Sequence, residues 1–192
     1  MLIYTKKVKA IAFSGSLLLC SFFTYAERPD IDALKTQAID IVKLFGGTLK
    51  PQLKKALSEG GVAKAIKVCS VKAPEIAKTL SLNTKWQVKR VSLKTRNNHS
   101  ATPNEWEKAT LEEFNQRQQQ GESAKTIAKA EIVNNEFRFM KAQGTETLCL
   151  TCHGINLNSE TKSALKQYYP EDKAIGYSLG EVRGAFSLSK KL

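Results

Sequence analysis

The sequence is poor in the side chains that bind metals. Its 192 residues include 4 cysteines, 2 histidines and 2 methionines. It has no second C-x-x-C pair and no H-x-x-H pair, which disfavours a zinc site because structural zinc usually takes four such ligands. Internal repeats and low-complexity segments are also missing, which excludes a solenoid. Against this scarcity, three of the six cysteine and histidine residues fall within five positions, in the segment CLTCH at 149–153.

The sequence also lacks an apolar run long enough to span a bilayer. The apolar stretch at 11–23 is shorter than the ~20 residues that a spanning helix needs. Three lysines precede this stretch, and small residues follow it at positions 24 and 26. This order is typical of a secretory signal. We therefore expect a signal sequence at 1–26, cleavage after Ala26, a mature chain in the periplasm and no membrane span in that chain.

The basic residues form no cluster. The formal net charge of +12 falls to +9 in the mature chain, because the signal carries three lysines and no acidic residue. The remaining lysines are scattered, so the charge indicates a solvated basic surface and argues against nucleic acid as a partner. Such a surface can steer encounters with acidic, exported protein partners. Residues 27–192 have the length of one ordinary domain, and we expect a single domain there.

Removal of the signal leaves an odd number of cysteines, namely Cys69, Cys149 and Cys152. They cannot all form internal disulfides, so at least one has another use. In an exported protein, C-x-x-C-H is typical of the covalent attachment of one c-type haem. Two thiols reach two vinyl groups on one porphyrin edge, and His153 turns its imidazole onto the iron. A thioredoxin-like pair is the main alternative, but that motif opens a helix in a βαβ unit and needs no histidine.

The mature chain offers few candidates for a second iron ligand. Electron-transfer cytochromes use methionine or histidine there. Met140 lies in an alternating segment, which places it on the sheet face opposite Phe137 and Phe139. His99 lies in a polar loop, where a histidine is usually solvated. Cys69 follows three apolar residues on one helical face, so its thiol is expected to point inward. These patterns leave Cys69 and Met140 as equal candidates.

The hydrophobic periodicity predicts helices first and strands later. The prolines at 51 and 74 are expected to start new helices, and the glycines at 60 and 61 to end one. Asn134-Asn135 is a hairpin signal between two strands. Thr102 followed by Pro103 predicts a helix start. The expected helices cover 29–50, 51–59, 62–69, 74–80, 102–120 and 159–168, and the expected strands cover 85–93, 127–133, 136–141 and 180–190. The order indicates an α+β fold, with N-terminal helices followed by an antiparallel sheet with inserted helices.

Four blocks of the sequence resemble successive blocks of a known family. They are KVCSVKAPEIA, RVSLKTRNNHSATPNEWEKATLEEF, LCLTCHG and YYPEDKAIGYSLGEVRGAFSL, and together they cover most of 60–190. The family consists of exported monohaem c-type proteins with a PAS-like fold and is catalogued as a domain of unknown function. The resemblance implies thioether attachment through Cys149 and Cys152, with His153 as one axial ligand. It also implies that Cys69 is the opposite ligand.

The resemblance also directs attention to two arginines and three glycines. Arg183 lies among Gly176, Gly180 and Gly184, where the backbone would pass close to the porphyrin or simply turn. Either Arg183 or Arg96 would then lie near a haem propionate.

Three functions follow for a haem-c protein. A thiolate ligand on a PAS-like fold favours a low-potential redox module or a haem-based redox or ligand sensor. One haem and a basic surface favour a simple electron carrier between exported partners. An enzyme such as a peroxidase is disfavoured, because no distal histidine with an acid-base partner is evident, and we expect no enzymatic activity.

Overall fold

A computed structural model describes residues 1–2 and 29–192 of the chain. Apart from its first two residues, the expected signal sequence at 1–26 lies outside the described residues. In the part that is described, no helix is both long enough and apolar enough to cross a membrane.

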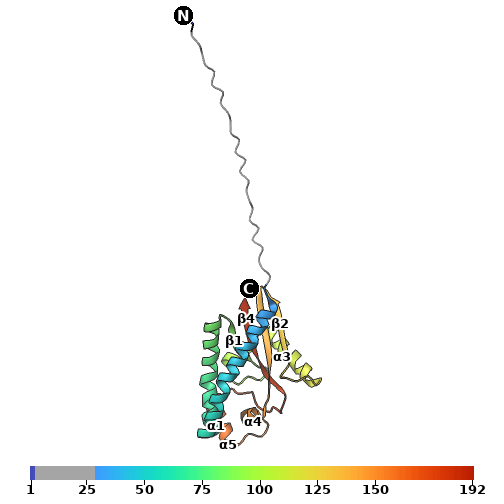
Figure 1. Cartoon of the computed structure of the whole chain (residues 1–192). Helices are drawn as coiled ribbons and strands as arrows, with labels where there is room; N and C mark the ends of the chain where they lie inside the picture. Colours follow the sequence, from blue (N-terminus) through green and yellow to red (C-terminus); the bar gives the residue numbers. More distant parts are fainter. Residues whose placement is uncertain (3–28) are drawn as a thin grey trace.

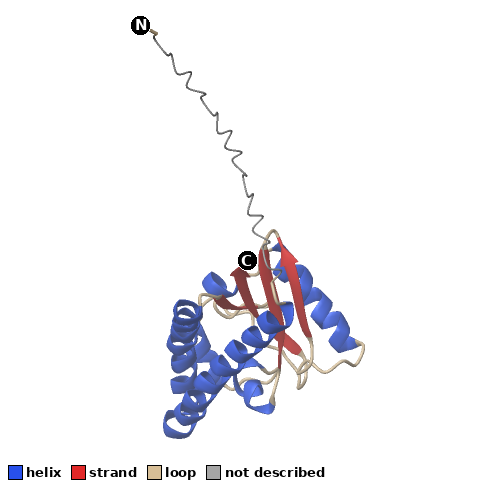
Figure 2. Cartoon of the chain, turned by 45° about the horizontal axis from the view of Figure 1, so that its top comes forward, coloured by secondary structure: helices blue, strands red, loops and turns tan. Residues whose placement is uncertain are grey.

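The first element of the described fold is one long helix, α1, Ile31–Thr84. Asp30 caps its start, where the side-chain oxygen accepts hydrogen bonds from the backbone N–H groups of Asp32 (3.1 Å) and Ala33 (2.9 Å). The helix breaks at Gly60 and Gly61, and Gly61 has a φ of +68°. Glycine adopts this conformation without a steric penalty. The break lets the two arms of α1 lie side by side as a helical hairpin (Figures 1 and 2).

The prediction that Pro51 and Pro74 start new helices is wrong, because both lie inside the arms of α1. A proline removes one backbone hydrogen bond and costs about 3 kcal/mol in a helix interior. Buried apolar residues lie on either side of each proline, including Leu49 and Ala56 in the first arm and Ile76 in the second. Their packing keeps each arm continuous. Only the predicted break at 60–61 is confirmed.

After α1, the chain forms a four-stranded antiparallel sheet in the order β1-β4-β3-β2. Its strands are β1 (Gln87–Val91), β2 (Ala128–Val133), β3 (Glu136–Gly144) and β4 (Val182–Lys191). The predicted hairpin between β2 and β3 is confirmed, and Asn134 and Asn135 take positive φ angles of 51° and 59° at its turn. The four strands and the preceding helices confirm the α+β class.

Four shorter helices complete the described chain: α2 (Asn98–Ala101), α3 (Glu105–Gln119), α4 (Thr147–His153) and α5 (Ser159–Tyr168). The prediction that Thr102 caps α3 is wrong, since the N-cap is Asn104. Its side chain accepts from the Glu107 N–H (3.0 Å), and the Glu107 carboxylate accepts from the Asn104 N–H (2.9 Å). This reciprocal capping box satisfies two helix-end donors that Thr102 would leave unpaired.

The two faces of the sheet are covered by different helices (Figure 2). Phe137 and Phe139 of β3 face α1 and pack with its buried apolar residues. Met140, the next residue, points to the other face and packs with Leu111 and Phe114 of α3. The predicted alternation along β3 is therefore confirmed. The helices α4 and α5 lie between β3 and β4 in the sequence and at one end of the α1 arms in space (Figure 1).

Candidate functional site

The C-x-x-C-H segment forms the short helix α4, which ends at His153. The first cysteine, Cys149, lies in its first turn and Cys152 in its last. Gly154 ends the helix, and a Cβ atom there would lie 2.6 Å from the carbonyl oxygen of Leu150. A glycine is therefore required directly after the histidine. At the other end of α4, Lys50 of α1 donates to the Glu146 carboxylate at 2.8 Å and 3.0 Å.

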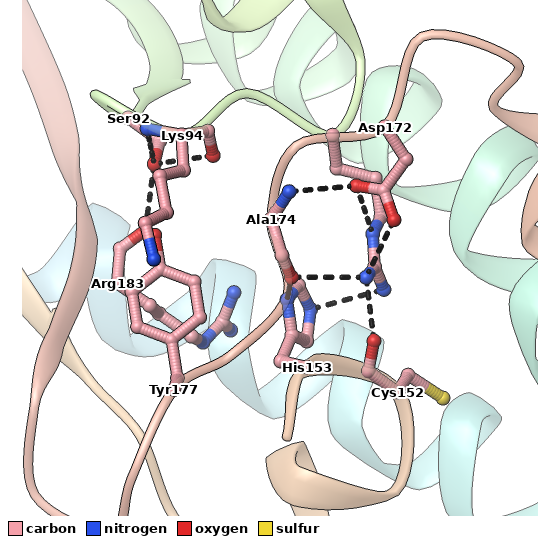
Figure 3. Close-up of polar contacts among 9 residues, drawn as sticks. Ser92, Lys94, Cys152, His153, Asp172, Ala174, Tyr177 and Arg183 are labelled. Atoms are coloured by element: carbon pink, nitrogen blue, oxygen red, sulfur yellow. Dashed lines mark hydrogen bonds and ion pairs between the residues drawn. The ribbon is translucent and has the colours of Figure 1, made fainter. Parts of the chain in front are cut away.

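A backbone segment at 174–177 holds the histidine in one orientation (Figure 3). His153 Nδ1 lies 2.7 Å from the carbonyl oxygen of Ala174. The N–H of Tyr177 donates to the His153 carbonyl at 2.9 Å, and the N–H of Gly176 donates to the Gly154 carbonyl at 3.0 Å. Since a carbonyl only accepts, Nδ1 carries the proton and Nε2 keeps its lone pair. Backbone carbonyls orient metal-binding histidines in the same way.

Arg96 contacts both His153 and the segment at 172–174. Its guanidinium donates to both carboxylate oxygens of Asp172 at 3.1 Å and to the Ala174 carbonyl at 3.1 Å. The same group donates to the Cys152 carbonyl, and Nη1 lies 3.3 Å from His153 Nε2. Figure 3 shows that the carbonyl of Cys152, and not its sulfur, takes part in these contacts. Arg96 therefore already has a carboxylate partner and organises the segments around α4.

Burial keeps the titratable groups of this region neutral. It lowers the pKa of His153 to about 2, and the positive charges of Arg183 and Arg96 add to this effect. It raises the pKa of Cys152 to about 11, and it raises the pKa of the Cys69 thiol even though Arg90 and Arg183 favour the thiolate. The imidazole is thus neutral at neutral pH, and burial disfavours the thiolate form of Cys69.

A cavity of about 960 Å³ brings the predicted residues together. Its volume lies at the upper end of the range of about 300–1,000 Å³ that small-molecule and cofactor sites occupy. Both arms of α1, the strands β1 and β4, and α4 contribute to its wall. The predicted site residues that line it are Cys69, Arg96, Cys149, Cys152, His153 and Arg183.

Two of the ligand candidates lie elsewhere. Met140 is fully buried in the core between the sheet and α3, and it does not line the cavity. His99 is exposed on the short helix α2. The inward orientation expected for Cys69 is confirmed, because its helical neighbours Ala65 and Ile66 are buried and the thiol lines the cavity.

The structure adds Arg90, which sequence reasoning missed as a site residue. Arg90 of β1 lines the cavity, and its guanidinium carbon lies 5.3 Å from the centre of the Phe45 ring. Burial lowers its pKa to about 10, and the nearby charge of Arg183 contributes. A signal was present in the sequence: Arg90 alternates with Trp86 and Val88 on the buried face of the strand, a position that rarely takes an unpaired charge.

The three glycines near Arg183 serve the backbone. Gly176 and Gly180 take φ angles of +78° and +85° in turns, with no atom near the position of a Cβ. Gly184 has a φ of +153°, and a Cβ there would lie 2.5 Å from the Val91 carbonyl oxygen. Gly184 thus allows β1 and β4 to approach closely. Gly176 and Gly180 serve turns, as one of the two interpretations from the sequence expected.

The geometry argues against the thioredoxin-like alternative to haem. The strands on either side of α4, β3 and β4, are antiparallel neighbours, so α4 is not the crossover of a βαβ unit. Among the described residues, no group of three or more histidine, cysteine or acidic side chains is placed to hold a metal ion. One histidine and three cysteines around a large cavity fit a haem, since a porphyrin supplies the remaining iron ligands and carries two carboxylates. A buried Nε of Arg183 that has no partner among the described residues fits such a carboxylate.

Comparisons with known proteins agree with the fold. The solved structure of the cyanobacterial heme-protein Tll0287 is similar, with 19% identity, a TM-score of 0.65 and coverage of 85% of this chain and 97% of that chain. At this level of identity the match establishes a shared fold. No curated protein matches the chain. The model of the Tll0287-like family matches residues 25–190, and this match confirms the resemblance found in four blocks of the sequence. Because it spans most of the sequence, the chain belongs to the Tll0287-like family.

Proposed function

We propose that this chain is an exported, periplasmic c-type monohaem protein that acts as a redox module or as a haem-based redox or ligand sensor. The single observation that carries the proposal is the state of His153. The histidine of a C-x-x-C-H segment is fixed through Nδ1, so Nε2 is unprotonated on a side chain that lines the cavity. Arg96 Nη1 lies 3.3 Å from Nε2, and a haem iron would have to replace this contact. The similar solved structure is that of a heme-protein, which supports the same cofactor. When bound, haem supplies one-electron chemistry at its iron.

Cys149 and Cys152 would hold the porphyrin through thioether bonds, with His153 as one axial ligand. For the second ligand we propose Cys69. Its thiol lines the same cavity as His153, whereas Met140 lies in the core on the other face of the sheet. Because burial disfavours the thiolate, the charge of the ferric iron would have to stabilise it. This coupling makes the Cys69 ligand sensitive to the redox state of the iron.

A thiolate ligand supports the sensor or low-potential module, as does the PAS-like fold implied by the family resemblance. An anionic sulfur stabilises the ferric state and lowers the potential, whereas the neutral thioether of methionine raises it. If the Cys69 ligand left the iron on reduction, a small gas molecule could bind at the vacated position. Signalling would then pass through an exported partner protein. We do not propose catalysis.

The alternative function is a simple electron carrier between exported partners. The basic surface favours it, because scattered lysines can steer an acidic partner. A midpoint potential as high as that of His/Met cytochromes, together with no binding of CO to the ferrous form, would support this alternative. A low midpoint with CO binding would support the sensor.

Haem staining of the purified mature protein on a denaturing gel, with intact mass, tests the central claim. We expect one haem that resists acid-acetone extraction, and extraction of the haem would refute the proposal. Electron paramagnetic resonance then tests the ligand. Cys69→Ala should abolish the low-spin thiolate signal, whereas Met140→Leu and His99→Ala should preserve it. Loss of the sixth ligand in Met140→Leu alone would assign the methionine instead.

A further inference from the structure

Two polar atoms of the cavity wall have no hydrogen-bond partner. In the part of the chain that the structure describes, Thr145 Oγ1 and Arg183 Nε are the buried side-chain polar atoms without one. Both residues line the cavity. Leaving a buried polar group unpaired costs about 1–3 kcal/mol, and more for a charged group. Their location on one cavity indicates that they are arranged for a group that enters it.

Backbone hydrogen bonds hold the main chain of both residues in place, and the two unpaired side-chain atoms are themselves buried. Thr145 donates its N–H to the Glu181 carbonyl, and its own carbonyl accepts from the N–H of Gly180, both at 2.8 Å. The Arg183 carbonyl accepts from Ser92 Oγ at 2.8 Å. Figure 3 shows the Arg183 guanidinium extending toward the side where His153 lies.

Arg90 adds a second positive charge to the same cavity. It lies on β1, the strand that pairs with β4. Neither Arg90 nor Arg183 forms an ion pair with a carboxylate of the described residues, whereas Arg96 is paired with Asp172. Two like charges that share a poorly solvated cavity repel each other, and an anion between or beside them would relieve this repulsion.

We propose that Arg183, Arg90 and Thr145 form a carboxylate-binding end of the cavity, separate from the Arg96–Asp172 pair that positions His153. The planar guanidinium fork matches a carboxylate, and a threonine hydroxyl adds one more donor. This inference rests on the proposed function in one respect, because the expected carboxylates are the two propionates of the haem. A free dicarboxylic acid that enters the cavity would offer the same chemistry.

The experiment compares the mature holoprotein with its Arg183→Met, Arg183→Lys, Arg90→Met and Thr145→Val variants. Arg138→Met is the matched control, since Arg138 pairs with Glu136 at 2.9 Å and does not line the cavity. The haem stain is read first, because a negative stain would refute the proposed function alone. The Arg183→Lys and Thr145→Val variants change few atoms and keep the test valid if a methionine variant fails to fold.

The first arm of the experiment reads the propionates in proteins that retain haem. Resonance Raman spectra should show shifted propionate bending modes in Arg183→Met and Thr145→Val, and an unchanged spectrum in Arg138→Met. Loss of a positive charge should also favour ferric iron in Arg183→Met. A tenfold change in the ferric preference corresponds to about 59 mV of lower midpoint potential.

The second arm of the experiment titrates succinate into each protein and follows binding by calorimetry, which needs no haem. Succinate binding by the wild type that Arg183→Met abolishes would support the site with a free acid as its ligand. Shifted propionate modes without succinate binding would support it with the haem as the source. Unchanged propionate modes together with no succinate binding would overturn the proposal.

Discussion

The two faces of the sheet are built from alternating residues of the same strands, yet they differ in what covers them. Toward α3, the buried side chains of Leu111, Phe114 and Met140 pack together in an apolar core. Toward α1, one part is an apolar core, and the rest opens into the cavity with Arg90 in its wall. This contrast indicates that the α3 face supplies stability. The cavity face instead holds charged and sulfur-bearing side chains, and their burial costs free energy.

The largest expected effect comes from the α3 face. Phe114→Ala removes a fully buried ring and should lower the free energy of unfolding by about 3–5 kcal/mol. Urea unfolding measures this loss. The exposed Ile155 is the control, and Ile155→Ala should change stability by no more than about 0.5 kcal/mol. A loss below about 1 kcal/mol in Phe114→Ala would remove the distinction between the two faces.

On the cavity side, the strongest single contact is the Arg96–Asp172 pair, whose side chains are 14% and 7% exposed. Asp172→Asn should cost about 3 kcal/mol, at the lower end for a broken buried pair, because Arg96 keeps two carbonyl acceptors. Calorimetric unfolding measures the cost. Glu136→Gln breaks a pair outside the cavity and should cost less. Equal costs would mean that Arg96 has no special role near His153.

The pH dependence of stability tests the burial of His153. Its pKa is lowered to about 2 in the folded chain, so the unfolded chain binds one more proton between that value and about 6.5. The neutral imidazole therefore contributes stability above pH 6.5, and this contribution falls by about 1.4 kcal/mol per pH unit at lower pH. Denaturant titrations of the haem-free chain from pH 7 to pH 4 should show a smaller loss of unfolding free energy for His153→Gln than for the wild type. A wild-type slope in His153→Gln would contradict the assignment.

The smallest expected effect concerns the pair of Lys50 and Glu146, which joins α1 to the start of α4. Its side chains are 54% and 49% exposed. Lys50 lowers the pKa of Glu146, but water screens such a pair. Lys50→Met should cost about 0.2–1 kcal/mol, and the difference should vanish in 1 M salt. Thermal unfolding at low and high salt measures this, and a loss that salt does not reduce would indicate packing instead of charge.

Local patterns allowed several elements to be predicted. Asn134-Asn135 indicated the hairpin, the alternation in β3 separated Phe137 from Met140, and the bounds of α5 agree with the predicted 159–168. These features depend on near neighbours in sequence, so short windows contain the needed information. The wrong predictions at Pro51, Pro74 and Thr102 have the opposite cause. Burial of the α1 arms and the capping box at Asn104 outweighed the local signals.

The residues alone were enough to mark CLTCH as a chemical motif and to show that an odd cysteine remains. They left Cys69 and Met140 equal as candidates until the family resemblance was considered. The folded chain placed Cys69 on the cavity and Met140 in the core. It also paired Arg96 with Asp172, whereas Arg90 and Arg183 have no carboxylate partner among the described residues. These outcomes depend on how α1, β1 and β4 meet across long stretches of chain. Such contacts are fixed by the packing of distant elements, and no local periodicity encodes them.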